Sequence, residues 1–141
     1  MVLVGVGALY GLRFFNPEYR QEQDAMRRLE AIEQEYQNDT YGGTTPEETL
    51  RLFIDALKKE DIDLAAKYFV IDRQEKRYGD LIELKTENRL KDVIDRLEKL
   101  QLTKKDDTQA YFVLVDKNKT IISQLIIKKE FKNNKWKITE F

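Results

Sequence analysis

The stretch TTPEETLRLFIDALKKEDIDLAAKYF, residues 44–69, decides the fold because it carries the clearest helix signals in the chain. Thr45 is a good N-cap, and Glu48 stands three residues later, as in a capping box. Pro46 falls at the first helical position, where its missing N–H group has no cost. Apolar residues then follow at the spacing of one buried helix face: Leu50, Phe53, Ile54 and Leu57. We therefore predict a helix that begins at Pro46 and ends near Lys58, whose charge suits the negative end of the helix dipole.

A second, shorter helix is predicted directly after the first. Either Asp61 or Asp63 can cap it, since aspartate accepts hydrogen bonds from the free N–H groups of a first turn. Its inner side is formed by Ile62, Ala65, Ala66 and Phe69. The C-terminal half of the chain then has to cover the apolar faces of both helices.

This helix pair resembles the start of small extracytoplasmic domains in the nuclear-transport-factor-two-like superfamily, which have a cone-shaped α+β fold. Many members open with a Thr-Pro-Glu-Glu cap, an apolar helix ending in Ala-Leu-Lys-Lys, an acidic turn, and Ala-Ala-Lys-Tyr-Phe. The C-terminal end is similar as well, because a lysine-rich hairpin closes on Trp136 and Ile138. The resemblance covers roughly residues 44–141. It implies an α+β fold, with N-terminal helices packed on a curved antiparallel sheet of three to four strands.

Composition limits the function classes. The chain has 141 residues, a charged content of 36% and a net charge of −1, as expected for one domain with a well-solvated surface and a tail. It contains no cysteine, which excludes disulfides, thiolate metal sites and cysteine nucleophiles. It contains no histidine, the commonest metal ligand and the usual proton shuttle near neutral pH. We therefore expect no cofactor and no metal, and the acidic pairs Asp61/Asp63 and Asp106/Asp107 are too local to form a metal site.

Residues 1–15 are apolar up to Arg13 and are expected to be a membrane segment. Spanning a bilayer takes about 20 apolar residues, so the run is short, and a membrane helix lacking its N-terminal part is our preferred interpretation. A cleaved signal core and an apolar segment that packs on the domain are the alternatives. Arg13 and Arg20 after the run favour a cytoplasmic domain by the positive-inside tendency, whereas the family resemblance favours a domain outside the cytoplasm.

Residues 16–43 are predicted to form a helical stalk and linker. Asn16 and Pro17 can start a helix that continues to about Gln37. Its apolar stripe is sparse, and residues 16–43 have a net charge of −4. The segment therefore suits a solvated spacer, or one helix of a weakly packed helix pair. Residues 38–44, with Gly42 and Gly43, are expected to be a flexible joint before the domain at residues 44–141.

The segment after Phe69 is predicted to contain one long helix. Gly79 is expected to break the polar segment that precedes it, and the helix is expected over residues 86–100. Its buried stripe would consist of Leu90, Val93, Ile94, Leu97 and Leu100. The Lys-Lys-Asp-Asp sequence at 104–107 is typical of a polar turn.

Three strands are predicted at the C-terminal end, at residues 109–115, 120–131 and 135–141. Turns are expected at residues 116–119 and 133–134. Residues 101–141 have a net charge of +4 from nine lysines and five acids, with no arginine. Lysines along a strand more often prevent a sheet edge from pairing with another chain than they contact nucleic acid. We therefore expect no nucleic-acid partner.

The resemblance implies five candidate catalytic residues, because some members of the superfamily use Asp and Tyr in a conical pocket for acid–base chemistry. They are Tyr68, Asp72, Tyr78, Asp80 and Tyr111. None belongs to a catalytic motif, and roles as core aromatics or as turn and cap residues explain them more simply.

Two functions are therefore weighed. The first is a non-catalytic binding or assembly module held at a membrane, with a homodimer formed through the sheet face or the stalk helix. The alternative is a small-molecule isomerase, cyclase or dehydratase that uses a buried Asp/Tyr pair. The enzyme requires a closed apolar cavity of roughly 300 Å³ or more.

Overall fold

The computed structural model describes residues 17–141, and the membrane segment predicted at residues 1–15 lies outside them. The chain divides into two compact units, Met1–Asn38 and Asp39–Phe141. The described part of the first unit is one helix, α2 (Pro17–Asn38), in the range where the sequence predicts a helix. None of its side chains is buried, and Met26, Leu29 and Ile32 are 57%, 62% and 48% exposed. Its role as a stalk stays a prediction.

Two capped helices open the second unit, as the sequence predicts. The helix α3 (Pro46–Lys58) begins after Thr45, whose hydroxyl accepts a hydrogen bond from the Glu48 N–H at 3.1 Å. The Glu48 carboxylate in turn accepts from the backbone N–H and the hydroxyl of Thr44, so the capping box is shifted by one residue. The helix α4 (Ile62–Lys67) is capped by Asp61, which accepts from the Leu64 N–H at 3.1 Å.

The next two helices correct the sequence-based boundaries. The helix α5 (Ile71–Thr86) runs through Gly79, so the prediction that this glycine breaks the segment was wrong. Gly79 lies on the exposed side of the helix, while Leu81 is fully buried and holds the helix against the core. A single helix over residues 86–100 was also wrong: the chain turns at Asn88, with φ of 57°, before α6 (Leu90–Glu98). An asparagine tolerates this left-handed conformation, which ends a helix.

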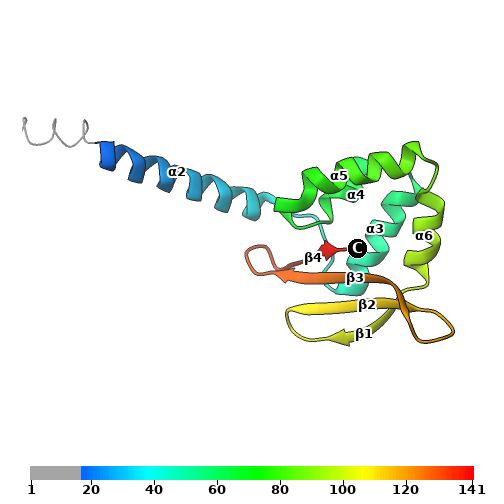
Figure 1. Ribbon diagram of the computed structural model, residues 1–141. Coiled ribbons are helices and arrows are strands. Elements are labelled where there is room, and N and C mark those ends of the chain that lie inside the picture. Colours follow the sequence, from blue (N-terminus) through cyan, green and yellow to red (C-terminus); the bar gives the residue numbers. More distant parts are fainter. Residues whose placement is uncertain (1–16) are drawn as a thin grey trace, which may run out of the picture. The chain divides into compact units, whose positions relative to one another are not determined.

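Four strands form one open antiparallel sheet in the order β1-β2-β3-β4. They are β1 (Gln101–Lys105), β2 (Gln109–Val115), β3 (Ile121–Glu130) and β4 (Lys135–Glu140). The sequence missed β1 because all five of its side chains are exposed, and Lys104 and Lys105, expected in a turn, belong to this edge strand. Short, lysine-bearing strands are typical of protected sheet edges. The α+β class, with helices packed on an antiparallel sheet, is confirmed (Figure 1).

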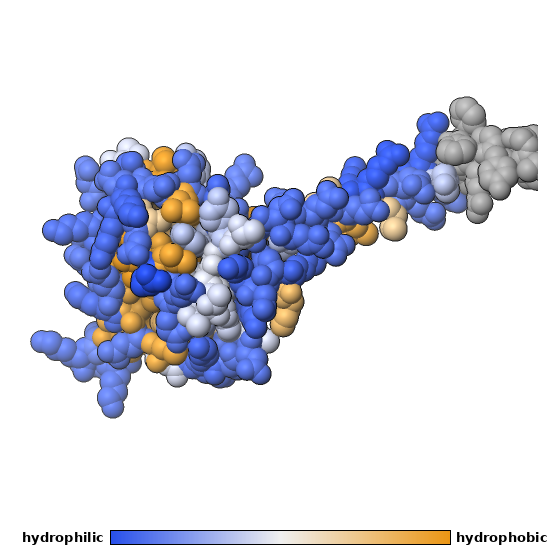
Figure 2. All heavy atoms as spheres, turned by 180° about the vertical axis from the view of Figure 1, so that it is seen from behind, coloured by the Kyte–Doolittle hydropathy of each residue, from blue (hydrophilic) through white to orange (hydrophobic). Residues whose placement is uncertain are grey.

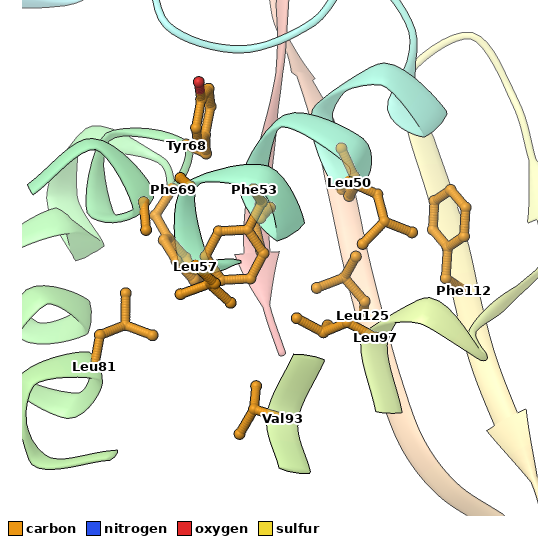
Figure 3. Close-up of a cluster of buried hydrophobic side chains, with 14 of the residues drawn as sticks. Leu50, Phe53, Leu57, Tyr68, Phe69, Leu81, Val93, Leu97, Phe112 and Leu125 are labelled. Carbon is orange, nitrogen blue, oxygen red and sulfur yellow. The ribbon is translucent and has the colours of Figure 1, made fainter. Parts of the chain in front are cut away.

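The hydrophobic core lies between the helices and one face of the sheet (Figure 3). Side chains alternate along β2 and β3, so Ala110 and Phe112 are buried opposite Ile127 and Leu125. The helices contribute Phe53 and Leu57 from α3, Leu81 from α5, and Val93 and Leu97 from α6. Every residue of the predicted stripe of α3 except the half-buried Ile54 is buried.

Two segments outside the strands pair with the free edge of β4. The Trp136 N–H donates to the Gly43 carbonyl at 3.0 Å, and the Ile138 N–H donates to the Tyr68 carbonyl at 2.9 Å. Residues 39–43, which the sequence assigns to a flexible joint, therefore belong to the second compact unit. This pairing places the start of the unit beside its last strand.

Candidate functional site

The space between helices and sheet, where the enzyme alternative requires a pocket, is occupied by aromatic side chains. The Phe53 ring packs edge-on against the rings of Phe69 and Phe141, with centroids 5.3 and 5.6 Å apart. Phe112 and Trp136 are also buried in the core. Aromatic side chains fill large volumes and pack well in these tilted arrangements. The described interior is thus a packed core.

A groove on the surface lies between α3 and α6. It has a volume of about 440 Å³ and is open to solvent. Its apolar lining comes from Leu50, Ile54, Leu97 and Leu100, and Glu47, Arg51, Asp55, Lys58 and Glu98 form its rim. The Lys58 ammonium and the Glu98 carboxylate form an ion pair there. Charges of both signs on this rim give it no preference for an anionic or a cationic ligand.

The candidate residues on the helices do not meet at one point. Tyr68 follows α4, and its ring is buried while its hydroxyl points away from the core (Figure 3). Burial raises the pKa of the Tyr68 hydroxyl, with further contributions from Tyr41 and Asp61. Asp72 is exposed in the first turn of α5, and Tyr78, further along the same helix, is 39% exposed.

The remaining two candidates have local partners. The Arg77 guanidinium donates to the Asp80 carboxylate one turn along α5, at 3.2 Å. The Tyr111 hydroxyl donates to the Gln109 side chain at 2.6 Å, and both lie on β2. Because Ala110 and Phe112 face the core, Tyr111 lies on the opposite face of the sheet. Within residues 17–141, no hydrogen bond joins one of these aspartates to one of these tyrosines.

The face of the sheet that carries Tyr111 mixes apolar and polar side chains, and the Lys104 ammonium of β1 lies 6.0 Å from the centre of the Tyr111 ring. Tyr111 pairs across the strands with Ile126, and Val113 lies two residues further along the same face of β2. The helices α3 and α6 lie on the other side of β1–β3 (Figure 1). This face is therefore available for contact with another surface.

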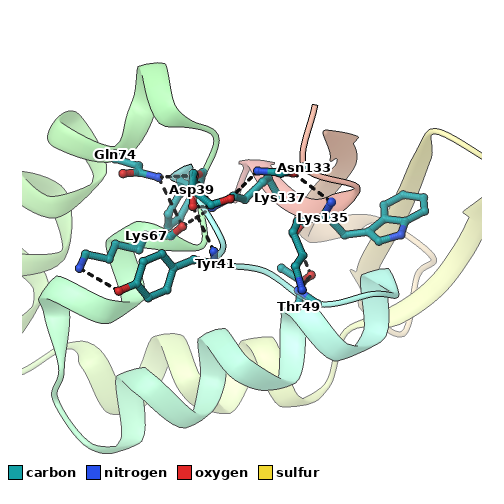
Figure 4. A network of polar contacts seen from close by, with 11 residues as sticks. Asp39, Tyr41, Thr49, Lys67, Gln74, Asn133, Lys135 and Lys137 are labelled. Atoms are coloured by element: carbon teal, nitrogen blue, oxygen red, sulfur yellow. Dashed lines mark hydrogen bonds and ion pairs between the residues drawn. The ribbon is translucent and has the colours of Figure 1, made fainter. Parts of the chain in front are cut away.

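The buried polar site of the molecule is centred on Asp39 and Lys137, neither of which the sequence singled out (Figure 4). The Lys137 ammonium donates to Oδ1 of Asp39 at 2.8 Å and to the carbonyl of Lys67 at 2.6 Å, and it lies 2.7 Å from Oδ2 of Asp39. Asp39 also accepts from the Tyr41 N–H and from the Gln74 side chain. The carbonyl of Lys67 lies at the C-terminal end of α4, where a cation is favoured.

Two of the three donors of the Lys137 ammonium thus have hydrogen-bond partners, and the whole Asp39 carboxylate lies beside its charge. Burial lowers the pKa of Lys137, while the hydrogen bond and charge of Asp39 act in the opposite direction. The pair of Asp39 and Lys137 therefore acts as a structural clamp, which joins the start of the second unit and α4 to the last strand. Sequence pattern could not reveal it, because a lysine between Trp136 and Ile138 on an alternating strand is expected to face solvent.

No group of three or more acidic side chains in residues 17–141 is placed to hold a metal ion. None of the helices formed by those residues is both long and apolar enough to cross a membrane.

The fold and the site thus define a small α+β protein with an open antiparallel sheet. A buried ion pair holds the first residue of its second unit, Asp39, against the last strand. Comparisons with protein-family models, with curated proteins and with solved structures find no match to this chain.

Proposed function

We propose that this chain is a non-catalytic binding or assembly module, held at a membrane through residues 1–15. The observation that carries the proposal is the packed interior, in which Phe53, Phe112 and Trp136 occupy the space that an enzyme of this fold would need for its substrate. A binding module needs an exposed surface and no cavity, and the sheet face around Tyr111 supplies such a surface.

The proposed domain is of the cone-shaped α+β type and lies on the extracytoplasmic side. Three irregularities in strand register support a curved sheet, at Leu102/Lys104, Leu114/Val115 and Ile126/Ile127. Bulges of this kind bend a strand and increase its twist. The paired caps on α3 and α4 also agree with the resemblance to the nuclear-transport-factor-two-like superfamily.

Two surfaces are proposed for assembly into a homodimer. The first is the sheet face with Tyr111, Val113 and Ile126, where Tyr111 pairs with Ile126 across neighbouring strands. The second is the side of α2 with Met26 and Leu29, where apolar side chains stand on an otherwise hydrophilic helix (Figure 2). These two side chains are three residues apart, so they lie on the same side of the helix and suit contact with a second helix.

The competing enzyme would use a buried Asp/Tyr pair in a closed apolar cavity. The distribution of the five candidates weighs against it, because Asp72 and Tyr78 are exposed and Tyr111 faces away from the core. Such a site needs its aspartate and tyrosine together in one apolar cavity.

Native mass spectrometry of the full-length chain, purified from membranes in mild detergent, tests the proposal. We expect a dimer without a bound small molecule. Ile126→Glu should give monomers if the sheet face forms the contact, and Leu29→Glu should do so if α2 forms it. A bare monomer would indicate a different protein partner. A chain that carries one small molecule per copy would overturn the proposal.

A further inference from the structure

The turn between β3 and β4 carries the most exposed large apolar side chain that the structure describes. Phe131 is 75% exposed and directly follows β3. A phenylalanine at a tip of this kind keeps a large apolar ring in water, so covering it with another apolar surface is favourable.

The same turn is strongly basic. Residues 128–135 contain four lysines and one glutamate, a net charge of +3, whereas the whole chain has a net charge of −1. Lys128 is exposed at the end of β3, and Lys129 and Lys135 pair with β4 and β3 residues beside it. Within residues 17–141, none of these three lysines takes part in an ion pair. The charge of Lys128, Lys129 and Lys135 is therefore available to an external anion.

The Asn133 side chain holds this hairpin beside the point where the chain enters the second unit, and it is itself fixed by a bond within the hairpin. The Asn133 side-chain amide donates to the Asp39 carbonyl at 2.6 Å and its oxygen accepts from the Lys135 N–H at 3.0 Å. Asp39 is itself fixed by Lys137 (Figure 4). Consequently Phe131 and its lysines lie at the same end of the unit as residue 39, to which the N-terminal part of the chain is connected.

We propose that the β3–β4 hairpin tip, residues 128–135, binds an anionic lipid surface, with Phe131 inserted at the headgroup level. Aromatic side chains favour the membrane–water interface, and clusters of lysines are attracted to anionic headgroups. Lysines act as point charges and suit a fluid array of headgroups, whereas sites that read one phosphate or carboxylate use the planar fork of arginine. The inference deepens the proposed function and rests on its membrane attachment.

The opposite end of the sheet provides the natural comparison. There the β2–β3 hairpin exposes Ile121 and Ile122, at 57% and 53%, so it is more apolar than the β3–β4 tip. It has only Lys117 and Lys119, and Asp116 offsets one of these charges. If apolar surface alone decided lipid contact, this tip would bind instead. If charge and an aromatic ring decide it, the β3–β4 tip binds.

Because the chain contains no cysteine, one label can be placed at each tip of the full-length protein. Phe131→Cys and Ile122→Cys would each carry an environment-sensitive fluorophore, in nanodiscs of neutral phosphatidylcholine or of phosphatidylcholine with phosphatidylglycerol. We expect a blue-shifted emission, quenched by nitroxide-labelled lipid, for the label at 131 on anionic discs only. In the labelled protein, Lys128→Gln should weaken this response about fivefold, as the loss of one lysine near the surface implies.

Several results would overturn the inference. They are no shift at 131, an equal or larger shift at 122, a shift that is the same on neutral discs, or a shift in detergent that grows with protein concentration and so reports a second copy. Attachment to the membrane through residues 1–15 is measured separately, as the retention of the chain on neutral discs. A chain that stays with neutral discs retains its tether whatever the label shows, whereas a chain that leaves them contradicts the attachment through residues 1–15, even where the tip responds to anionic lipid.

Discussion

The ammonium of Lys137 lies 2.7 Å from a carboxylate oxygen of Asp39, and the two side chains are 1% and 8% exposed. The pair spans 98 residues and joins the first residue of the second unit to its last strand. The Gln74 side chain and the carbonyl of Lys67 complete the site, so α4 and α5 are tied to the same point.

Loss of the ammonium is expected to destabilise the protein strongly. Lys137→Met leaves the Asp39 carboxylate buried without its counter-charge, and breaking a buried pair on one side costs about 3–5 kcal/mol. Urea unfolding of the variant and the parent would measure the difference in free energy of unfolding. A loss below about 1 kcal/mol would show that water reaches Asp39 and that the pair is not a clamp.

Two controls separate burial from charge. Lys58→Ala breaks the exposed pair with Glu98 and should change stability by less than about 1 kcal/mol. Asp39→Leu combined with Lys137→Met removes both buried charges and should recover most of the stability lost in Lys137→Met, since apolar replacements of buried pairs are often nearly neutral.

The hydroxyl of Thr49 provides a second test of the same region. It accepts from the Gly43 N–H and donates to the Trp136 carbonyl, both at 2.9 Å, and the side chain is fully buried. Thr49→Val keeps the shape but leaves two buried backbone groups unpaired, so we expect a loss of about 1–3 kcal/mol in urea unfolding. Thr86→Val, at an exposed hydroxyl bonded to the Ile82 carbonyl, should stay within about 0.5 kcal/mol.

The cap of α3 should make stability depend on pH. Hydrogen bonds from the backbone and hydroxyl of Thr44 hold the pKa of Glu48 below its ordinary value of 4.5. A carboxylate whose pKa is lower in the folded state stabilises the protein above its unfolded pKa, and this stabilisation disappears as pH falls through the folded pKa. The melting temperature of the parent should therefore exceed that of Glu48→Gln at neutral pH, and the difference should vanish in acid.

A matched variant separates the contribution of the Thr44 hydroxyl from that of the Thr44 backbone N–H. Thr44→Val removes only the hydroxyl and keeps the backbone bond, so a smaller pH-dependent difference between Glu48 and glutamine should remain in that background. A difference that persists unchanged at acidic pH would mean that packing of the side chain, and not its charge, stabilises the cap.

Local signals predicted much of the second unit. Thr45 and Pro46 marked the start of α3 because a cap acts within one turn, and the turns flanking β3 were marked by residues that favour them. The strand β1 was not predicted, because its five exposed residues show no alternation of apolar and polar side chains. Its position in the sheet depends on pairing with β2. The ion pair between Asp39 and Lys137 was not predicted either, because the two residues are 98 positions apart and no local pattern links them.

Glycines provide the last prediction, because sequence alone cannot tell a helix breaker from a tolerated residue. A Cβ added to Gly79 would meet no atom within 4 Å, so Gly79→Ala should stabilise α5 by about 0.5–1 kcal/mol through the reduced freedom of the unfolded chain. At Gly43 an added Cβ would lie 2.7 Å from the Glu48 Cβ and 2.8 Å from the Thr49 nitrogen, so Gly43→Ala should destabilise the protein. Thermal unfolding followed by circular dichroism would compare the two. If both variants lost stability, α5 would not be continuous through residue 79, and the boundary expected from the sequence would have to be restored.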